Sequence, residues 1–129
     1  DRDHSRTRRD ALNLRARTVL GERSTLTFIF NHLDQPDTQD PLGLTSAQLT
    51  ENRRQPGTNA LAFDTRKSVR HSQAGLAWQH ELTNSQSLRV SAYGGTRRVE
   101  QFLAFDGAGA TSSGGVVDLD RQFAGLGLE

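Results

Sequence analysis

The sequence has no cysteine, few apolar residues and no long hydrophobic run. The lack of cysteine excludes a disulfide framework, a thiolate metal site and a cysteine nucleophile. Apolar residues make up 33% and aromatic residues 6% of the 129 residues, whereas a soluble domain usually carries about half apolar residues. No run of apolar residues is long enough for a transmembrane helix, and no signal-peptide pattern is present. Disorder does not explain this polarity, because the 16 basic and 15 acidic residues nearly cancel to a net charge of +1.

The main pattern in the sequence is alternation of apolar and polar residues with a period of two. In the first such run Leu12 and Leu14 occupy even positions, and Arg15 and Arg17 occupy odd ones. This alternation is typical of a strand with one apolar and one polar face. We therefore predict antiparallel strands, neighbours in chain order, near residues 11–20, 24–33, 70–82, 87–103 and 121–129.

The connections between these strands alternate between short and long. Residues 21–23 and 83–85 form minimal turns, whereas residues 34–70 and 104–120 lack periodicity and are rich in turn residues. Within the first long connection, Thr45 and Gln48 fit a capping box and predict one short helix near 46–53.

This combination predicts an all-β fold, an antiparallel up-and-down meander that forms a segment of a large transmembrane β-barrel. Outer-membrane barrels have short periplasmic turns, long extracellular loops, and strands that alternate apolar-out and polar-in. The predicted lipid-facing surface comprises Leu12, Leu14, Ala16, Leu26, Phe28, Phe30, Leu76, Trp78, Leu88 and Val90. A soluble antiparallel sandwich alternates in the same way, but the chain has no more apolar set of strands to cover the polar faces.

Several segments resemble the barrel of TonB-dependent outer-membrane receptors of the siderophore-receptor type. They are residues 31–45 (NHLDQPDTQDPLGLT), 59–70 (NALAFDTRKSVR), 114–121 (GGVVDLDR) and the opening stretch 1–13. The resemblance implies a bacterial outer-membrane location and a 22-stranded barrel with a plugged lumen. Residues 1–129 would supply about four strands and the start of a fifth. The plug domain, the TonB box and the closing strand are absent, and both ends of the chain look cut, so we expect a fragment of a larger protein.

The expected function is energy-coupled import of a ferric siderophore or a similar large, scarce ligand. The expected partners are outer-membrane lipid, the ferric chelate and, through the absent N-terminal parts, the TonB complex. Two alternatives stay open: a passive porin or adhesin barrel, and a soluble β-sheet module that binds a ligand. No nucleophile, metalloprotease, P-loop or dinucleotide motif is present, so we expect neither an enzyme nor a bound cofactor.

Candidate ligand-binding residues come from the long loops and from the polar strand face. Arginine binds carboxylates bidentately and suits an anionic chelate, although a solvated charged rim is the simpler explanation. Asp34, Asp37 and Asp40 form a D-x-x-D-x-x-D pattern that could attract a cation, but aspartate is also common in turns. The full set is Arg15, Arg17, Asp34, Asp37, Asp40, Arg66, Arg70, Tyr93 and Arg97.

Other polar residues give weaker signals. His32 and His71 lie where strands meet the first long loop and could approach each other, but we predict no metal site. The basic run at residues 2–9 is diluted by aspartates, so we predict no binding to nucleic acid. Charge complementarity favours a hairpin register that pairs Glu81 with Arg89. The competing register pairs Gln79 with Arg89 and shortens the turn to residues 83–85.

Overall fold

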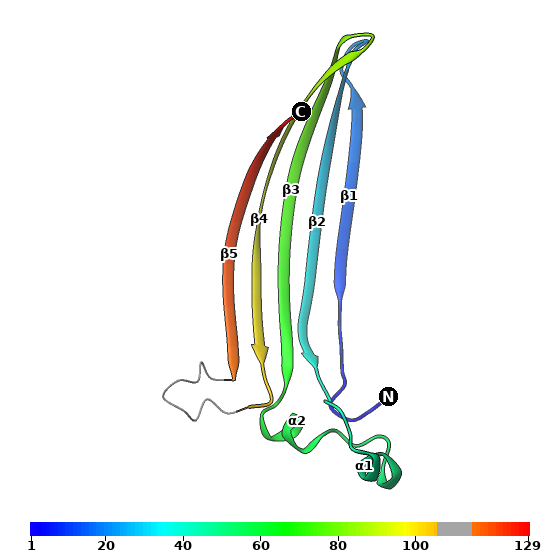
Figure 1. The fold of residues 1–129 in the computed structure, drawn as a ribbon, viewed down its shortest axis with the longest axis vertical. Helices are drawn as coiled ribbons and strands as arrows, with labels where there is room; N and C mark the ends of the chain where they lie inside the picture. The colour runs from blue at the N-terminus through cyan, green and yellow to red at the C-terminus, as the bar shows by residue number, and fades with distance from the viewer. Residues whose placement is uncertain (106–114) are drawn as a thin grey trace. The chain divides into compact units, whose positions relative to one another are not determined.

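The structure, a computed structural model, describes residues 1–105 and 115–129. It contains one five-stranded sheet whose strands follow one another in chain order, from β1 to β5 (Figure 1). The strands are β1 (Asp10–Val19), β2 (Ser24–Gln39), β3 (Arg66–Thr83), β4 (Gln86–Phe102) and β5 (Val116–Leu128). The predicted all-β antiparallel meander is confirmed.

The two short connections are tight turns. Between β1 and β2 the backbone N–H of Leu20 donates to the carbonyl of Ser24 at 2.8 Å. Gly21 has a φ of +73° there, a conformation that glycine adopts without steric cost. Between β3 and β4 only Asn84 and Ser85 lie outside the strands. Both turns lie where the sequence predicts them.

The chain divides into two compact units that cut across the strands. The first, the loop unit, contains residues 1–10, 34–70 and 98–119. The second, the strand unit, contains residues 11–33, 71–97 and 120–129. Each is described by itself below.

The loop unit holds the few buried residues. Among the described residues, Ala60, Thr65 and Val99 are buried, and all three belong to this unit. The Thr65 hydroxyl donates to the carbonyl of Asp40 at 2.6 Å, and the Thr65 N–H donates to the carbonyl of Ala60 at 3.0 Å. A small hydrogen-bonded core therefore orders the long connection between β2 and β3.

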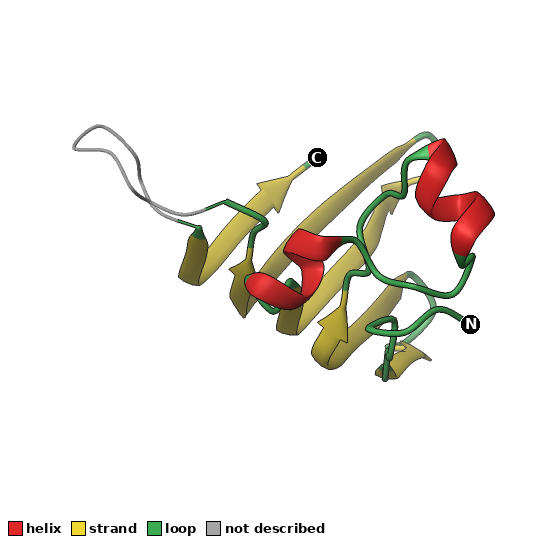
Figure 2. Ribbon diagram, turned by 90° about the horizontal axis from the view of Figure 1, so that it is seen from below, coloured by secondary structure: helices red, strands yellow, loops and turns green. Residues whose placement is uncertain are grey.

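Both helices of the described residues lie in that same connection (Figure 2). Helix α1 (Ser46–Glu51) starts where predicted and carries the predicted capping box, in which Thr45 and Gln48 bond each other reciprocally. It ends two residues earlier than expected. Helix α2 (Thr58–Ala62) was not predicted, because five residues after Gly57 are too few to show a helical period.

The strands around the long connections extend further than predicted. Strand β2 continues from residue 33 to Gln39, β3 begins at Arg66 instead of 70, and β5 begins at Val116 instead of 121. The first long loop is therefore shorter than 34–70. Backbone pairing continues there without apolar alternation, so the sequence pattern misses it. Part of the second predicted loop, 106–114 with Gly107, Gly109 and Gly114, lies outside the described residues.

The register between β3 and β4 contradicts the predicted Glu81–Arg89 pair. A Cβ built on Gly75 would lie 3.3 Å from the Cβ of Tyr93, so these two residues are directly opposite. Counting along both strands places Gln79 opposite Arg89. On the other edge of β4, next to β5, the Arg89 backbone exchanges two hydrogen bonds with Glu129, of 2.9 and 3.0 Å, and Arg89 Nη1 lies 3.7 Å from Glu129 Oε2. Turn geometry, rather than charge, sets this register.

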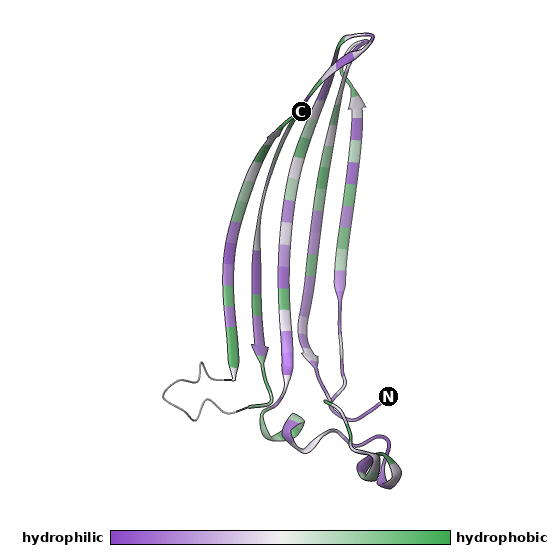
Figure 3. Cartoon of the chain, in the orientation of Figure 1, coloured by the Kyte–Doolittle hydropathy of each residue, from purple (hydrophilic) through white to green (hydrophobic). Residues whose placement is uncertain are grey.

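The strand unit has no hydrophobic core. Every one of its residues is described, and none is buried. Polar and apolar residues alternate along its strands, as the colours of β1 in Figure 3 show. Four large apolar side chains of the predicted even face are exposed: Leu12 (57%), Leu14 (50%), Leu76 (49%) and Val90 (38%). The two faces of this sheet differ in polarity, and no residue of either face is buried.

Neither helix among the described residues is long and apolar enough to cross a membrane.

Candidate functional site

The odd-numbered face of the strand unit carries a basic hollow, which we call the arginine hollow. Its volume is about 220 Å³. Four adjacent strands line it, and its polar lining comprises Arg15, Arg17, Thr25, Thr27, Gln79 and Arg89. The predicted pair Arg15 and Arg17 therefore lies together, with hydroxyl and amide groups beside it.

The arginines of this hollow are weakly neutralised. Within the described part of the chain, neither Arg15 nor Arg17 forms an ion pair. The Arg89–Glu129 pair is long, and its side chains are 53% and 72% exposed. An exposed pair of this kind contributes about 0–1 kcal/mol. The hollow consequently presents a surplus of positive charge.

The predicted arginines of the loop unit are paired instead. Arg70 Nε donates to Asp34 Oδ1 at 3.2 Å. Arg66 pairs with Asp64, lies 3.8 Å from Asp37, and sits 3.6 Å above the ring of Phe102. These contacts hold neighbouring strands and turns together, so they give Arg66 and Arg70 structural roles.

The three aspartates of the D-x-x-D-x-x-D pattern do not form a single site. Asp34 and Asp37 pair with different arginines. Asp40 Oδ1 accepts the backbone N–H of Leu42 at 2.9 Å, which is the ordinary turn role of aspartate. No group of three or more metal-ligating side chains occurs among residues 1–105 and 115–129.

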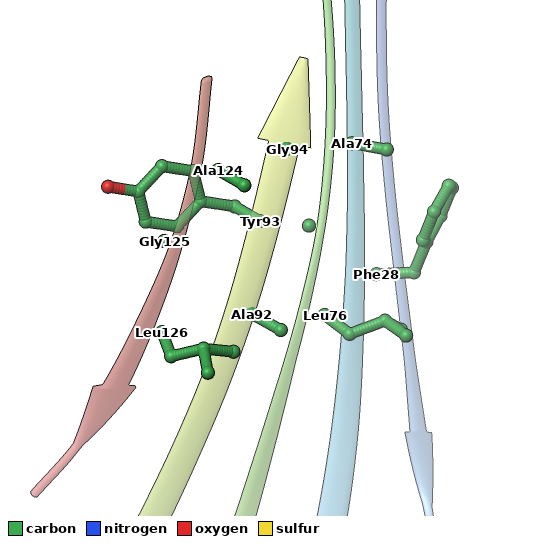
Figure 4. A pocket seen from close by; sticks show the side chains of 10 residues that line it. Phe28, Ala74, Leu76, Ala92, Tyr93, Gly94, Ala124, Gly125 and Leu126 are labelled. Atoms are coloured by element: carbon green, nitrogen blue, oxygen red, sulfur yellow. The ribbon is translucent and has the colours of Figure 1, made fainter. Parts of the chain in front are cut away.

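Tyr93 belongs to an aromatic cluster on the odd face of the strand unit. Its ring centroid lies 6.5 Å from that of Phe123, and His71 stacks on Phe123 at 5.8 Å. The Tyr93 ring also lies against Gly125, as Figure 4 shows. Arg97, the remaining predicted residue, is exposed on β4. The structure brings neither residue to the arginine hollow.

The two candidate histidines do not meet. His32 Nδ1 lies 2.8 Å from Ser72 Oγ, a cross-strand pair at even positions. His71 occupies an odd position and stacks on Phe123. Because alternate residues of a strand point to opposite faces, His32 and His71 cannot share a ligand.

Arg2 has a structural role that the sequence does not reveal. Its guanidinium donates four hydrogen bonds of 2.7–3.2 Å to the backbone carbonyls of Pro41, Leu42 and Gln55. These bonds join the N-terminal segment to the long connection within the loop unit. The N-terminal basic run is thus partly used in holding this loop.

An apolar hollow of about 450 Å³ lies on the strand unit (Figure 4). Its lining includes small residues such as Ala74, Ala92 and Ala124, together with Phe28 and Leu126. In Figure 4, Ala92 and Leu76 project away from the side on which the Tyr93 ring lies. This is the face predicted to contact lipid.

Sequence reasoning missed four contributors to the arginine hollow: Thr25, Thr27, Gln79 and Arg89. All four occupy odd positions, so the sequence alone assigns them to the same polar strand face as Arg15 and Arg17. Their convergence depends on the register between strands, which the sequence did not determine. The chain matches no known protein-family model.

Proposed function

We propose that this chain is a wall segment of an outer-membrane β-barrel that imports a ferric siderophore or a similar ligand in an energy-coupled manner. The observation that carries the proposal is the strand unit, a meander with two chemically different faces and no core. Such a sheet requires cover on both sides. Lipid on the apolar face and a wet lumen on the polar face would supply it.

Two cross-strand histidine–serine pairs support contact of the even face with lipid. Ser24 Oγ lies 2.7 Å from His80 Nδ1, and His32 Nδ1 lies 2.8 Å from Ser72 Oγ. Between them, along β2, the even positions are Leu26, Phe28 and Phe30.

The spacing of these two pairs fits a bilayer. Eight residues of strand extend about 26 Å. At the tilt of 35–45° that is typical of membrane barrels, this length covers about 20 Å of the roughly 25 Å apolar band. In the proposed orientation the two pairs would lie near the two edges of the apolar band, toward the headgroup regions. His80 also stacks on Trp78, with 5.5 Å between ring centroids, and tryptophan favours such interfaces.

Import of an anionic chelate is supported by the polar face and by the ordered long connection. The arginine hollow presents guanidinium groups that bind carboxylates in a bidentate way. The loop unit, with two helices and a small core, would form part of a vestibule outside the membrane. Movement of a plug, coupled to an energised inner-membrane partner, would complete the transport step.

Two other functions remain candidates. A passive porin or adhesin would use the same wall without energy coupling. A soluble ligand-binding module would stay monodisperse in water without detergent, which the exposed apolar face of the strand unit argues against.

Uptake of iron by the native host tests the proposal. Cells that carry or lack the gene for this chain would be starved of iron and given ⁵⁵Fe bound to citrate, to a hydroxamate or to a catecholate. We expect the deletion to abolish uptake of one of these chelates, and a protonophore to do the same in the intact strain. Uptake that persists with the protonophore would indicate a passive channel. Recovery of the chain in the soluble fraction would indicate the soluble module.

A further inference from the structure

We propose that the arginine hollow on the strand unit is a binding site for a small multivalent anion that bears carboxylate or phosphate groups. This inference rests on the proposed function only for the identity of the anion in the cell. The binding itself follows from the side chains of the hollow, and it is separate from the loops on which the sequence places the aspartates.

The strand register builds the site. Arg15 and Arg17 are two residues apart on β1 and therefore share a face, as do Thr25 and Thr27 on β2. Gln79 of β3 and Arg89 of β4 are opposite each other and belong to the same lining, together with the apolar residues Ile29 and Ala77. Three arginine residues thus line one hollow of about 220 Å³.

No acidic residue is among those that line the hollow, so its positive charge is not neutralised there. Arg15 and Arg17 have no carboxylate partner among the described residues, and Arg89 has only the long contact with Glu129. Elsewhere in the chain Arg8, Arg66 and Arg70 all form ion pairs with aspartates. An anion in the hollow would supply the missing negative charge.

The donor set suits oxyanions rather than other ligands. A guanidinium group offers a rigid fork of N–H donors that matches carboxylate and phosphate oxygens. The hydroxyls of Thr25 and Thr27 and the amide of Gln79 add neutral donors that can turn toward further oxygens. A compact anion with several oxygens, such as citrate or phosphate, would use both kinds of donor.

The hollow adjoins the tight turn between β1 and β2. A second hollow shares Arg17, Thr25 and Gln79 with it and continues to Glu22 and Arg23 at that turn and to Glu81 at the end of β3. In the proposed barrel, short turns face the periplasm. The anion site would then lie on the periplasmic side of the wall.

Calorimetric titration of the purified chain with citrate and, separately, with inorganic phosphate tests the inference. The chain would be kept in an uncharged glucoside detergent at low ionic strength, so that no phosphate headgroup competes. The variants are Arg17→Gln and Arg89→Gln. Arg53→Gln, an exposed arginine of the loop unit, is the matched control for charge. Arg17→Lys keeps the positive charge but removes the planar fork of N–H donors, so it separates the two contributions.

We expect wild type to bind at least one of the two anions. The anion that binds more tightly shows whether the hollow prefers carboxylate or phosphate groups. Each glutamine variant in the hollow should weaken binding about tenfold, since hydrogen bonds to charged groups are the strong ones. Arg17→Lys should weaken it less, and Arg53→Gln should leave it unchanged. Circular dichroism of each variant shows whether the strands persist.

Three results would overturn the inference. One is an absence of binding of either anion to folded wild type at millimolar concentration. Another is an equal loss in Arg53→Gln, which would indicate general charge attraction. The third is capture of an acidic peptide in preference to both anions, which would assign the hollow to a protein segment. None of these depends on iron uptake, so failure of the proposed function would be recognised separately.

Discussion

Substitution of Gly95 by alanine should destabilise the strand unit because the neighbouring strands approach its backbone closely. A Cβ at this position would overlap the carbonyl oxygen of Ser72. It would also lie 2.7 Å from Phe123 Cζ and 3.0 Å from the Cα of Gln73. Ordinary carbon contacts are about 3.5–4.0 Å, so the β3 backbone would have to move and the Phe123 ring would have to shift.

The expected cost follows from these overlaps. Overpacking of this kind costs about 1–3 kcal/mol, and overlap with backbone atoms favours the upper half of that range. Loss of backbone freedom in the unfolded chain returns about 0.4–1 kcal/mol. We therefore expect Gly95→Ala to lower the free energy of unfolding by about 2 kcal/mol, measured by urea titration in uncharged detergent with circular dichroism.

Two further glycines make the experiment discriminating. At Gly125 the three atoms nearest to a Cβ would all belong to the Tyr93 side chain, with its Oη at 2.5 Å and its Cε1 at 2.6 Å. Gly125→Ala should therefore cost less than Gly95→Ala, and Tyr93→Leu should rescue it. At Gly43 nothing lies within 4 Å, so Gly43→Ala should be neutral or slightly stabilising. Equal losses at Gly43 and Gly95 would refute the reasoning.

Other substitutions test the loop unit. Arg2→Gln removes hydrogen bonds to backbone carbonyls and should speed trypsin cleavage after Arg54 roughly tenfold or more; an unchanged rate would contradict its role in holding the loop. Thr45→Ala removes the capping box and should destabilise helix α1 by about 1 kcal/mol, seen as faster amide exchange within that helix and nowhere in the strand unit. Arg66→Gln removes the contact with Phe102 together with the ion pairs to Asp64 and Asp37 and should cost about 1 kcal/mol in urea titration, whereas an unaltered midpoint would show that these contacts contribute nothing to stability.

The sequence was sufficient for the parts of the fold that depend on side-chain alternation or on a local cap. Alternation identified five strands and the partition of Leu76 and Arg17 to different faces. The pair Thr45 and Gln48 identified the start of α1, because a capping box is a contact between residues three apart.

The parts that were missed depend on contacts between distant residues. The extension of β2 to Gln39 follows from backbone pairing and from the contact of Asp34 with Arg70, which are far apart in sequence. The register that places Arg89 opposite Gln79 follows from the tight turn between β3 and β4 and from the close approach of Gly75 to Tyr93. Charge complementarity within the hairpin carried too little energy to predict it.

The central claim, that the even face of the strand unit contacts lipid, is tested most directly by the fluorescence of Trp78, the one tryptophan in the chain. Wild type would be reconstituted in vesicles that contain lipids with a nitroxide near the headgroup or deep in the acyl chain. Because Trp78 stacks on His80 near the proposed boundary, the shallow nitroxide should quench it more than the deep one. A Trp78→Phe, Ala77→Trp variant moves the fluorophore to the odd face and should resist both lipids while remaining open to aqueous iodide. Equal quenching at the two positions, or quenching of Trp78 by iodide alone, would contradict the proposed orientation.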